Sequence, residues 1–447
     1  MSFFKKYIGS LFLTNRLYAA LALCIVLFVT RYFLVWLGII PFVAFLIFAT
    51  IMVFDYLLLY ASNQHVFARR SMAERLSNGD ENGIRIDFEN RYKIPINLEV
   101  VDEVPHQLQK RDVFFQLQLK ANEQKHLIYQ LRPVKRGTYN FGTVNLFVSS
   151  LIGFIRRRFI VDAPVDVPVY PSYLQMRKYQ LMAISNRLSE TGLKKVRRFG
   201  HSMEFEQIKE YVQGDDYRTL NWNATARRGQ LMVNTYSDEK SQQVYCVIDK
   251  SRVMKMPFEA LSLLDYSINA SLVLSNVALV KQDKAGIVTF AEGIGSFLKA
   301  DRKSLQMQSI LEVLHNQKTR YLESDFEKLY SLLKLKVTQR SLVVLFTNFE
   351  SLSAMRRQLP YLRSIAKNHL LVVIFFENTE LKSVFSEPAE TLEKIYTKTI
   401  AEKFAFEKRQ IVKELNRYGI MSILTPPKDL TVNALNKYLE IKARNQI

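Results

Sequence analysis

The most apolar part of the chain lies near its start. From Leu17 to Tyr60 the sequence is almost wholly apolar, and only Arg31, the stretch 38–41 and Asp55 interrupt it. A membrane-spanning helix needs about 20 apolar residues. The length therefore predicts two transmembrane helices, at about 17–36 and 39–60, within an N-terminal segment 1–66. A buried helical hairpin of a soluble protein is the weaker alternative, because soluble helices seldom stay apolar on every side for so long.

Basic residues flank this apolar region. Lys5, Lys6 and Arg16 precede it, and Arg69, Arg70 and Arg75 follow it. Loops rich in lysine and arginine stay on the cytoplasmic side of a membrane. The pattern predicts that both flanks are cytoplasmic and that Arg31 is outside, with Tyr32 and Trp36 at the headgroup level. Asp55 is expected near the cytoplasmic end of its helix, within reach of water.

Residues 67–170 alternate between apolar and polar positions in short runs. In IRIDFEN, for example, Ile84, Ile86 and Phe88 share one face. The runs INLEV, FQLQLK and HLIYQL repeat this period of two, and turn signals such as SNGDENG separate them. Half-buried strands at such spacing predict a small antiparallel β-sandwich. No catalytic cluster is visible in this part.

Residues 241–447 follow a different pattern, in which buried strands alternate with helices. QVYCVID, AGIVTF, SLVVLFT, HLLVVIFF and GIMSILTP are strand-like, and amphipathic stretches separate them. This order predicts a doubly wound α/β domain with a parallel sheet. Functional residues of such folds lie at the carboxyl ends of the strands, which here carry Asp249 and the stretch 347–349. Residues 171–240 are predicted to be a linker.

Composition limits the chemistry that this chain can perform. The formal charge is +20, which favours contact with anionic lipid headgroups, nucleic acid or an acidic protein. For a membrane-tethered protein the lipid surface is the plainest explanation, and nucleic-acid binding is an unlikely third candidate function. The two cysteines, Cys24 and Cys246, lie in separate apolar runs and predict neither a disulfide nor a thiolate metal site. No P-loop or H-E-x-x-H motif is present.

The predicted linker carries an unusual stretch, EYVQGDDYRTLNWNATARRG, at 210–229. Asp215 and Asp216 are candidates for an acid–base pair, but adjacent residues in a turn usually point apart. Arg218 and Arg227 are expected to keep both carboxylates ionised, with Trp222 packed beneath them. We interpret the stretch as a brace between the two soluble domains, partly exposed for a partner.

The signature GD-D-x-R-x-x-x-W-x-x-(S/T)-A-R, set between a small β domain and an α/β domain, resembles the bacterial family called domain of unknown function fifty-eight. The matching residues include Glu204, Phe205, Glu210, Gly214, Asp215, Asp216, Arg218, Trp222, Ala226 and Arg227. The resemblance implies a von Willebrand factor A-like α/β domain, location in the bacterial inner (cytoplasmic) membrane, and association with a MoxR-type AAA ATPase.

Domains of the von Willebrand factor A type often hold a divalent cation on a D-x-S-x-S loop, a threonine and a later aspartate. The corresponding residues here are Asp249, Ser251, Ser324 and Asn348, with Val253 in place of the second serine. A hard cation needs several oxygen ligands and negative charge. The loop is therefore predicted to be a degenerate metal site without a cofactor, and weak Mg²⁺ binding by Asp249, Ser251 and Ser324 is the alternative.

These observations predict a non-enzymatic adaptor or scaffold, anchored in the membrane and facing the cytoplasm. Its α/β domain is expected to bind a protein partner, and the resemblance implies that this partner is a MoxR-type AAA ATPase in complex assembly or maturation. The alternative function is a membrane-tethered, metal-dependent hydrolase or nuclease that uses Asp215, Asp216 and Glu204. That alternative requires the three carboxylates to converge in a cleft.

Overall fold

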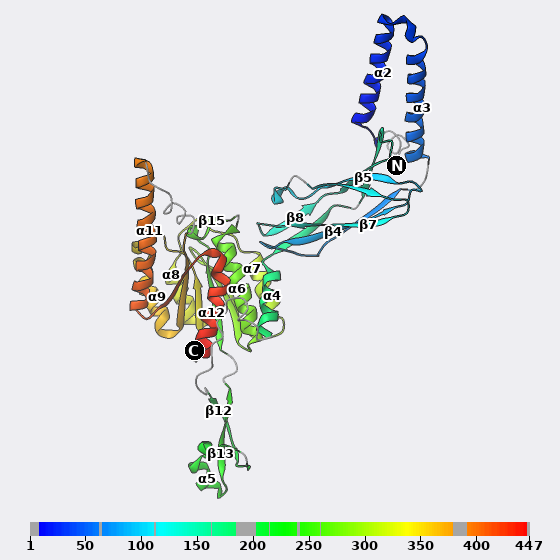
Figure 1. Ribbon diagram of the computed structural model, residues 1–447. Coiled ribbons are helices and arrows are strands. Elements are labelled where there is room, and N and C mark those ends of the chain that lie inside the picture. The colour runs from blue at the N-terminus through cyan, green and yellow to red at the C-terminus, as the bar shows by residue number, and fades with distance from the viewer. Residues whose placement is uncertain are drawn as a thin grey trace. The chain divides into compact units, whose positions relative to one another are not determined.

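The structure is a computed structural model with two compact units, Met1–Tyr170 and Pro171–Ile447. It describes residues 9–61, 65–110, 113–161, 163–184, 203–213, 215–238, 242–259, 261–378 and 391–444. Each unit is described by itself (Figure 1).

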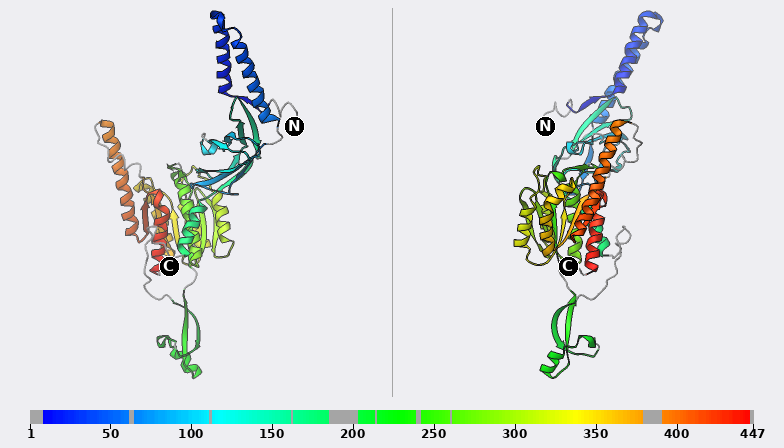
Figure 2. Two further views of the ribbon diagram at one scale, coloured as in Figure 1. Left: turned by 45° about the vertical axis from the view of Figure 1, so that its right-hand side comes forward. Right: turned by 90° about the vertical axis from the view of Figure 1, so that its left-hand side faces the viewer.

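The first unit begins with a short strand, β1 (Leu11–Leu13), and two long helices, α2 (Asn15–Phe33) and α3 (Ile40–Tyr60). Gly38, with φ of 51°, permits the turn between the helices, which lie side by side in Figures 1 and 2. Three helices of the described residues are long and apolar enough to cross a membrane: α2, α3 and α6 (Leu263–Val280). The protein itself buries 78% of the apolar window of α6, but only 11% and 17% of those of α2 and α3. The apolar surfaces of α2 and α3 therefore remain exposed.

The rest of the first unit consists of strands in three sheets. Their orders are β1-β10-β9-β5-β6, β3-β11-β8 and β2-β4-β7. The strands are β2 (Val66–Ser71), β3 (Leu76–Ser77), β4 (Asn82–Asn90), β5 (Ile96–Asp102), β6 (Phe114–Leu119), β7 (Gln124–Leu131), β8 (Gly137–Phe141), β9 (Val144–Ser149), β10 (Ile155–Val161) and β11 (Val165–Tyr170). The predicted alternation is confirmed, because Ile84, Ile86 and Phe88 are all buried in one core. All strand pairs are antiparallel among the described residues, except β3 with β11.

The expectation that Asp55 lies within reach of water is wrong. Asp55 is 0% exposed. Its carboxylate accepts hydrogen bonds from the hydroxyl of Ser150 and from the backbone N–H groups of Phe154 (2.9 Å) and Ile155 (3.0 Å). Nearby, Arg157 donates to the carbonyl of Leu59 at 2.6 Å, near the carboxyl end of α3. These bonds attach the helical pair to the β9–β10 turn, a contact between residues far apart in the sequence.

The second unit contains a six-stranded sheet in the order β18-β17-β14-β19-β20-β21. The strands are β14 (Gln243–Asp249), β17 (Lys284–Phe290), β18 (Ile294–Asp301), β19 (Leu342–Phe346), β20 (Leu370–Phe376) and β21 (Met421–Thr425). Five strands are parallel, and only the edge strand β18 is antiparallel to its neighbour. The chain reverses its direction of winding between β14 and β19, so their carboxyl ends form the position at which doubly wound folds place their sites.

Helices cover both faces of this sheet (Figures 1 and 2). One face packs against α6, α7 (Gln306–His315) and α12 (Leu430–Ala443), and the other against α8 (Phe326–Lys336), α9 (Leu352–Asn368) and α11 (Leu392–Arg417). Successive residues of β14 alternate between the two cores: Val244, Cys246 and Ile248 join the first, and Tyr245 and Val247 the second. This double burial explains why QVYCVID is apolar throughout.

The predicted linker contains regular structure. A helix, α4 (Tyr173–Ile184), packs against α6 through Met176 and Tyr179. Further along, β12 (Met203–Glu210) and β13 (Met232–Asp238) form an antiparallel pair, with the short helix α5 (Trp222–Arg228) between them. We call the segment 203–238 the signature hairpin.

Candidate functional site

A small crevice opens where β14 and β19 end. Asp249 is the last residue of β14, and Thr347 and Asn348 follow β19. Ser324, which precedes α8, approaches from a separate loop and lines the same crevice. The cavity has a volume of about 70 Å³. The structure thus brings Asp249, Ser251, Ser324 and Asn348 together, as the resemblance implied.

The carboxylate of Asp249 is engaged by the chain on both oxygens. Its Oδ1 accepts from the Ser324 hydroxyl at 2.6 Å and from the Ser251 N–H at 2.9 Å, and its Oδ2 accepts from the Thr347 hydroxyl at 2.7 Å. Asp249 is 1% exposed, and burial raises its pKa above the ordinary value although these hydrogen bonds oppose the rise. Thr347 was named only as a strand end in the sequence analysis, yet it completes this set of donors.

A half-buried lysine contacts Asn348 at the crevice. Lys408, from α11, donates to Oδ1 of Asn348 at 2.6 Å, and its ammonium lies 5.6 Å from the centre of the Phe375 ring. Burial lowers the pKa of Lys408 to about 8, although the negative charge of Glu350 opposes the shift. Lys408 was not predicted from the sequence. Its spacing from Ile411 and Leu415, three and seven positions further, places it on the buried stripe of the helix.

This donor set fits a divalent cation poorly. The hydroxyls of Ser324 and Thr347 both donate to the carboxylate of Asp249, so they are already engaged. Asn348 replaces a second carboxylate and is bound to an ammonium group, which repels a dication. Among the described residues, no group of three or more His, Cys, Asp or Glu side chains has the arrangement of a metal site. The absence of a metal here stays a prediction.

The acidic pair of the signature hairpin stabilises turns. Lys209 donates to Oδ1 of Asp215 at 2.9 Å, and the Val212 N–H donates to Oδ2 at 3.1 Å. Both hydrogen bonds lower the pKa of Asp215. Asp216 accepts from the Arg218 N–H at 3.0 Å and so caps the turn that follows.

Two details of the predicted brace are wrong. Trp222 is 68% exposed and not packed beneath the aspartates. The cationic partner of Asp215 is Lys209 rather than an arginine, while the guanidinium of Arg218 lies 5.9 Å from the centre of the Tyr217 ring. The role of the hairpin as a fastening between the soluble domains stays a prediction.

The other signature residues are exposed or lie outside the described residues. Glu210, at the end of β12, and Ala226 and Arg227, on α5, are exposed. Gly214 and the side chains of Glu204 and Phe205 lie outside the described residues.

The strand order and the crevice together define a doubly wound α/β domain, carried on a chain with two apolar helices near its start. Comparison with known proteins gives a match to one family model. Residues 207–384 match the family described as "Protein of unknown function DUF58", which confirms the predicted resemblance over that range. A relative, "Uncharacterized protein YeaD" of Bacillus subtilis (strain 168), is 23% identical over 228 residues. The match covers 49% of this chain and 54% of YeaD, so the chain spans about half the length of this relative.

Solved structures with similar segments include the SpRpn10 VWA domain, with a TM-score of 0.28 and 13% identity over 44% of this chain and 94% of that domain. Another is the conserved hypothetical protein BatB from Bacteroides thetaiotaomicron, with a TM-score of 0.28 and 11% identity over 45% of this chain and 98% of BatB. A VWA domain is therefore among the structures to which this chain is similar.

Proposed function

We propose that the protein is an adaptor anchored in the bacterial inner membrane, with its soluble parts in the cytoplasm. The support for the anchor is the exposed apolar surface of α2 and α3, two helices of membrane-spanning length. Tyr32 and Trp36, at the turn between them, are strongly exposed and suit a headgroup layer. The basic residues that flank the helical pair favour the cytoplasmic orientation.

The observation that carries the adaptor role is the engaged state of Asp249. Its carboxylate accepts three hydrogen bonds from the chain, which occupy most of its acceptor sites. Small-molecule sites are typically about 300–1,000 Å³ in volume, and the crevice of about 70 Å³ is much smaller. A shallow, internally bonded surface suits recognition of another protein.

The partner that we propose is a MoxR-type AAA ATPase, engaged in the assembly or maturation of a protein complex. The family resemblance supports this choice. Charged side chains at the rim, including those of Arg252, Arg357 and Glu323, give the crevice the polar border that protein interfaces have.

The alternative function, a metal-dependent hydrolase or nuclease, has less support. Asp215 is held by Lys209 and a backbone N–H, and Asp216 caps a turn. Neither carboxylate is buried, and each has its own hydrogen-bond donors. A site of that class would need them to converge on one ion or one proton.

Capture from gently solubilised membranes tests the adaptor role. The wild-type chain is expected to retain an AAA ATPase that mass spectrometry identifies as MoxR-type. Arg357→Glu, at the rim of the crevice, should lower that recovery about tenfold, because it places a negative charge at the contact. Lys334→Glu, an equal charge reversal in the last turn of α8, should leave it unchanged. The proposal would be contradicted if both variants retained the ATPase, or if the wild-type sample lacked it.

A further inference from the structure

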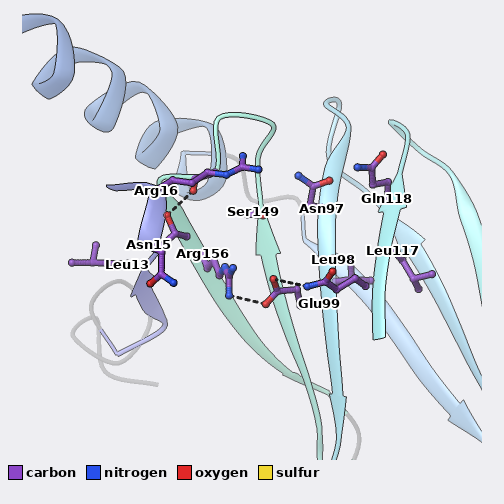
Figure 3. A pocket seen from close by; sticks show the side chains of 13 residues that line it. Leu13, Asn15, Arg16, Asn97, Leu98, Glu99, Leu117, Gln118, Ser149 and Arg156 are labelled. Carbon is purple, nitrogen blue, oxygen red and sulfur yellow. Dashed lines mark hydrogen bonds and ion pairs between the residues drawn. The ribbon is translucent and has the colours of Figure 1, made fainter. Parts of the chain in front are cut away.

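A polar groove lies at the end of the first unit from which α2 starts (Figure 3). Its volume is about 590 Å³, within the usual range for a small-molecule site. The first turn of α2 forms one wall, and β10, β9, β5 and β6 form the floor. None of the features predicted from the sequence drew attention to it.

The floor is built from a row of polar side chains across four strands. Arg156 of β10 pairs with Ser149 of β9, Ser149 pairs with Asn97 of β5, and Asn97 pairs with Gln118 of β6. Directly paired residues in antiparallel strands share one face of the sheet. The preceding or following residues, such as Val148 and Leu98, point into the core. The row therefore forms a polar strip on the face of the sheet that points away from the core.

Among the described residues, the charges of the groove leave one cation, Arg16, without an acidic partner. Arg156 donates to Glu99 at 2.7 Å, and Gln116 donates to the same carboxylate at 3.5 Å, so that pair is neutral. Arg16 donates to the carbonyl of Ile152 at 3.5 Å. Figure 3 shows Arg16 reaching from the start of α2 toward Asn97. The amino end of α2 adds positive potential at the same wall.

The neutral polar groups around Arg16 can form hydrogen bonds with the hydroxyls of a ligand. Amide side chains at Asn97, Gln116 and Gln118 and the hydroxyl of Ser149 line the groove. Within the described part of the chain, Oδ1 of Asn97 has no hydrogen-bond partner. A ligand that carries hydroxyls and one phosphate would satisfy both the amides and the guanidinium.

We propose that this groove binds the headgroup of an anionic glycerophospholipid, with the phosphate at Arg16 and the headgroup hydroxyls at the amide row. The proposal rests on the membrane anchorage proposed above. Leu13 lines the groove, and the exposed apolar side chain of Leu23 lies seven positions after Arg16, on the same face of α2. They give the acyl chains an apolar surface to follow, which a soluble phosphate ester would not need.

The test uses the full chain, purified in mild detergent from membranes and incubated with defined lipids. Native mass spectrometry should show that phosphatidylglycerol is retained about tenfold more than phosphatidylcholine. Arg16→Gln should abolish this preference, and Asn97→Leu should weaken it severalfold. Arg85→Gln, which removes an exposed arginine of β4, is the matched control and should retain the preference.

The controls distinguish failure of the lipid-binding proposal from failure of the membrane anchorage. Recovery of every variant in the alkali-resistant membrane fraction is measured first, because failure there would contradict the anchorage itself. A wild-type protein in the membrane without lipid preference, or a preference that survives both groove substitutions, would overturn the proposal. Millimolar glycerol 3-phosphate or inorganic phosphate is added in parallel. Displacement of the lipid by either would assign the groove to soluble phosphates instead.

Discussion

Replacing Asp55 with alanine is expected to loosen the junction between the helical pair and the β strands. The substitution removes one carboxylate that accepts three hydrogen bonds, and it leaves the hydroxyl of Ser150 and the N–H groups of Phe154 and Ile155 without that acceptor in a buried place. Each unsatisfied donor costs about 1–3 kcal/mol. The local free energy of opening should therefore fall by about 3 kcal/mol or more, which is a factor of about 100.

Hydrogen exchange of the full chain in detergent measures this effect. The amides of Phe154 and Ile155 should exchange about 100-fold faster in Asp55→Ala, and less so in Asp55→Asn, which keeps one acceptor oxygen. Asp87→Ala is the control, because Asp87 is a partly exposed residue of β4 that pairs with Arg85 on the surface. Unchanged exchange at the β9–β10 turn in Asp55→Ala would show that Asp55 does not hold the junction.

A divalent cation site is expected to appear when Asn348→Asp is combined with Lys408→Met. The wild-type crevice holds an amide and an ammonium where a metal site needs negative oxygens. The two substitutions make the local charge more negative by two units and supply a second carboxylate opposite Asp249. A dissociation constant below about 1 mM for Mg²⁺ or Mn²⁺ is expected for the double variant, with no detectable binding to the wild-type chain.

Calorimetry of the full chain in detergent compares the two. Asn316→Asp, which adds a carboxylate at the exposed carboxyl end of α7, should bind no metal and controls for added charge alone. A micromolar signal from the wild-type chain that Asp249→Ala abolishes would show that the crevice is a working metal site. Metal binding restored by Asn348→Asp without Lys408→Met would show that the lysine is not the obstacle.

The repeating parts of the fold could be predicted because local patterns determine them. The alternation of Ile84, Ile86 and Phe88 follows from one buried face, and the apolar run 243–249 follows from burial on both faces. The strands and helices after Asp249 appear in the predicted order. The antiparallel direction of β18 was not predicted, because pairing direction depends on the connection and not on the pattern of the strand itself.

The contacts that define the sites could not be predicted in this way. Asp55 was expected near water because the apolar segment was considered alone, while its partners lie about 100 residues further along the chain. Lys408 was missed for the same reason, since its partner Asn348 is 60 residues away. Trp222 was expected to be packed because tryptophan is usually buried, but it is 68% exposed on the short helix α5.

The proposed function requires that α2 and α3 cross a membrane, with the soluble parts of the chain on its cytoplasmic side. Both native thiols are buried, and burial raises the pKa of Cys246 to about 12, so introduced cysteines give the signal. A membrane-impermeant maleimide added to intact cells should label Leu34→Cys, at the turn between the helices. It should label Ile128→Cys, an exposed position of β7, only after the cells are opened. Labelling of both positions from the same side would contradict the account.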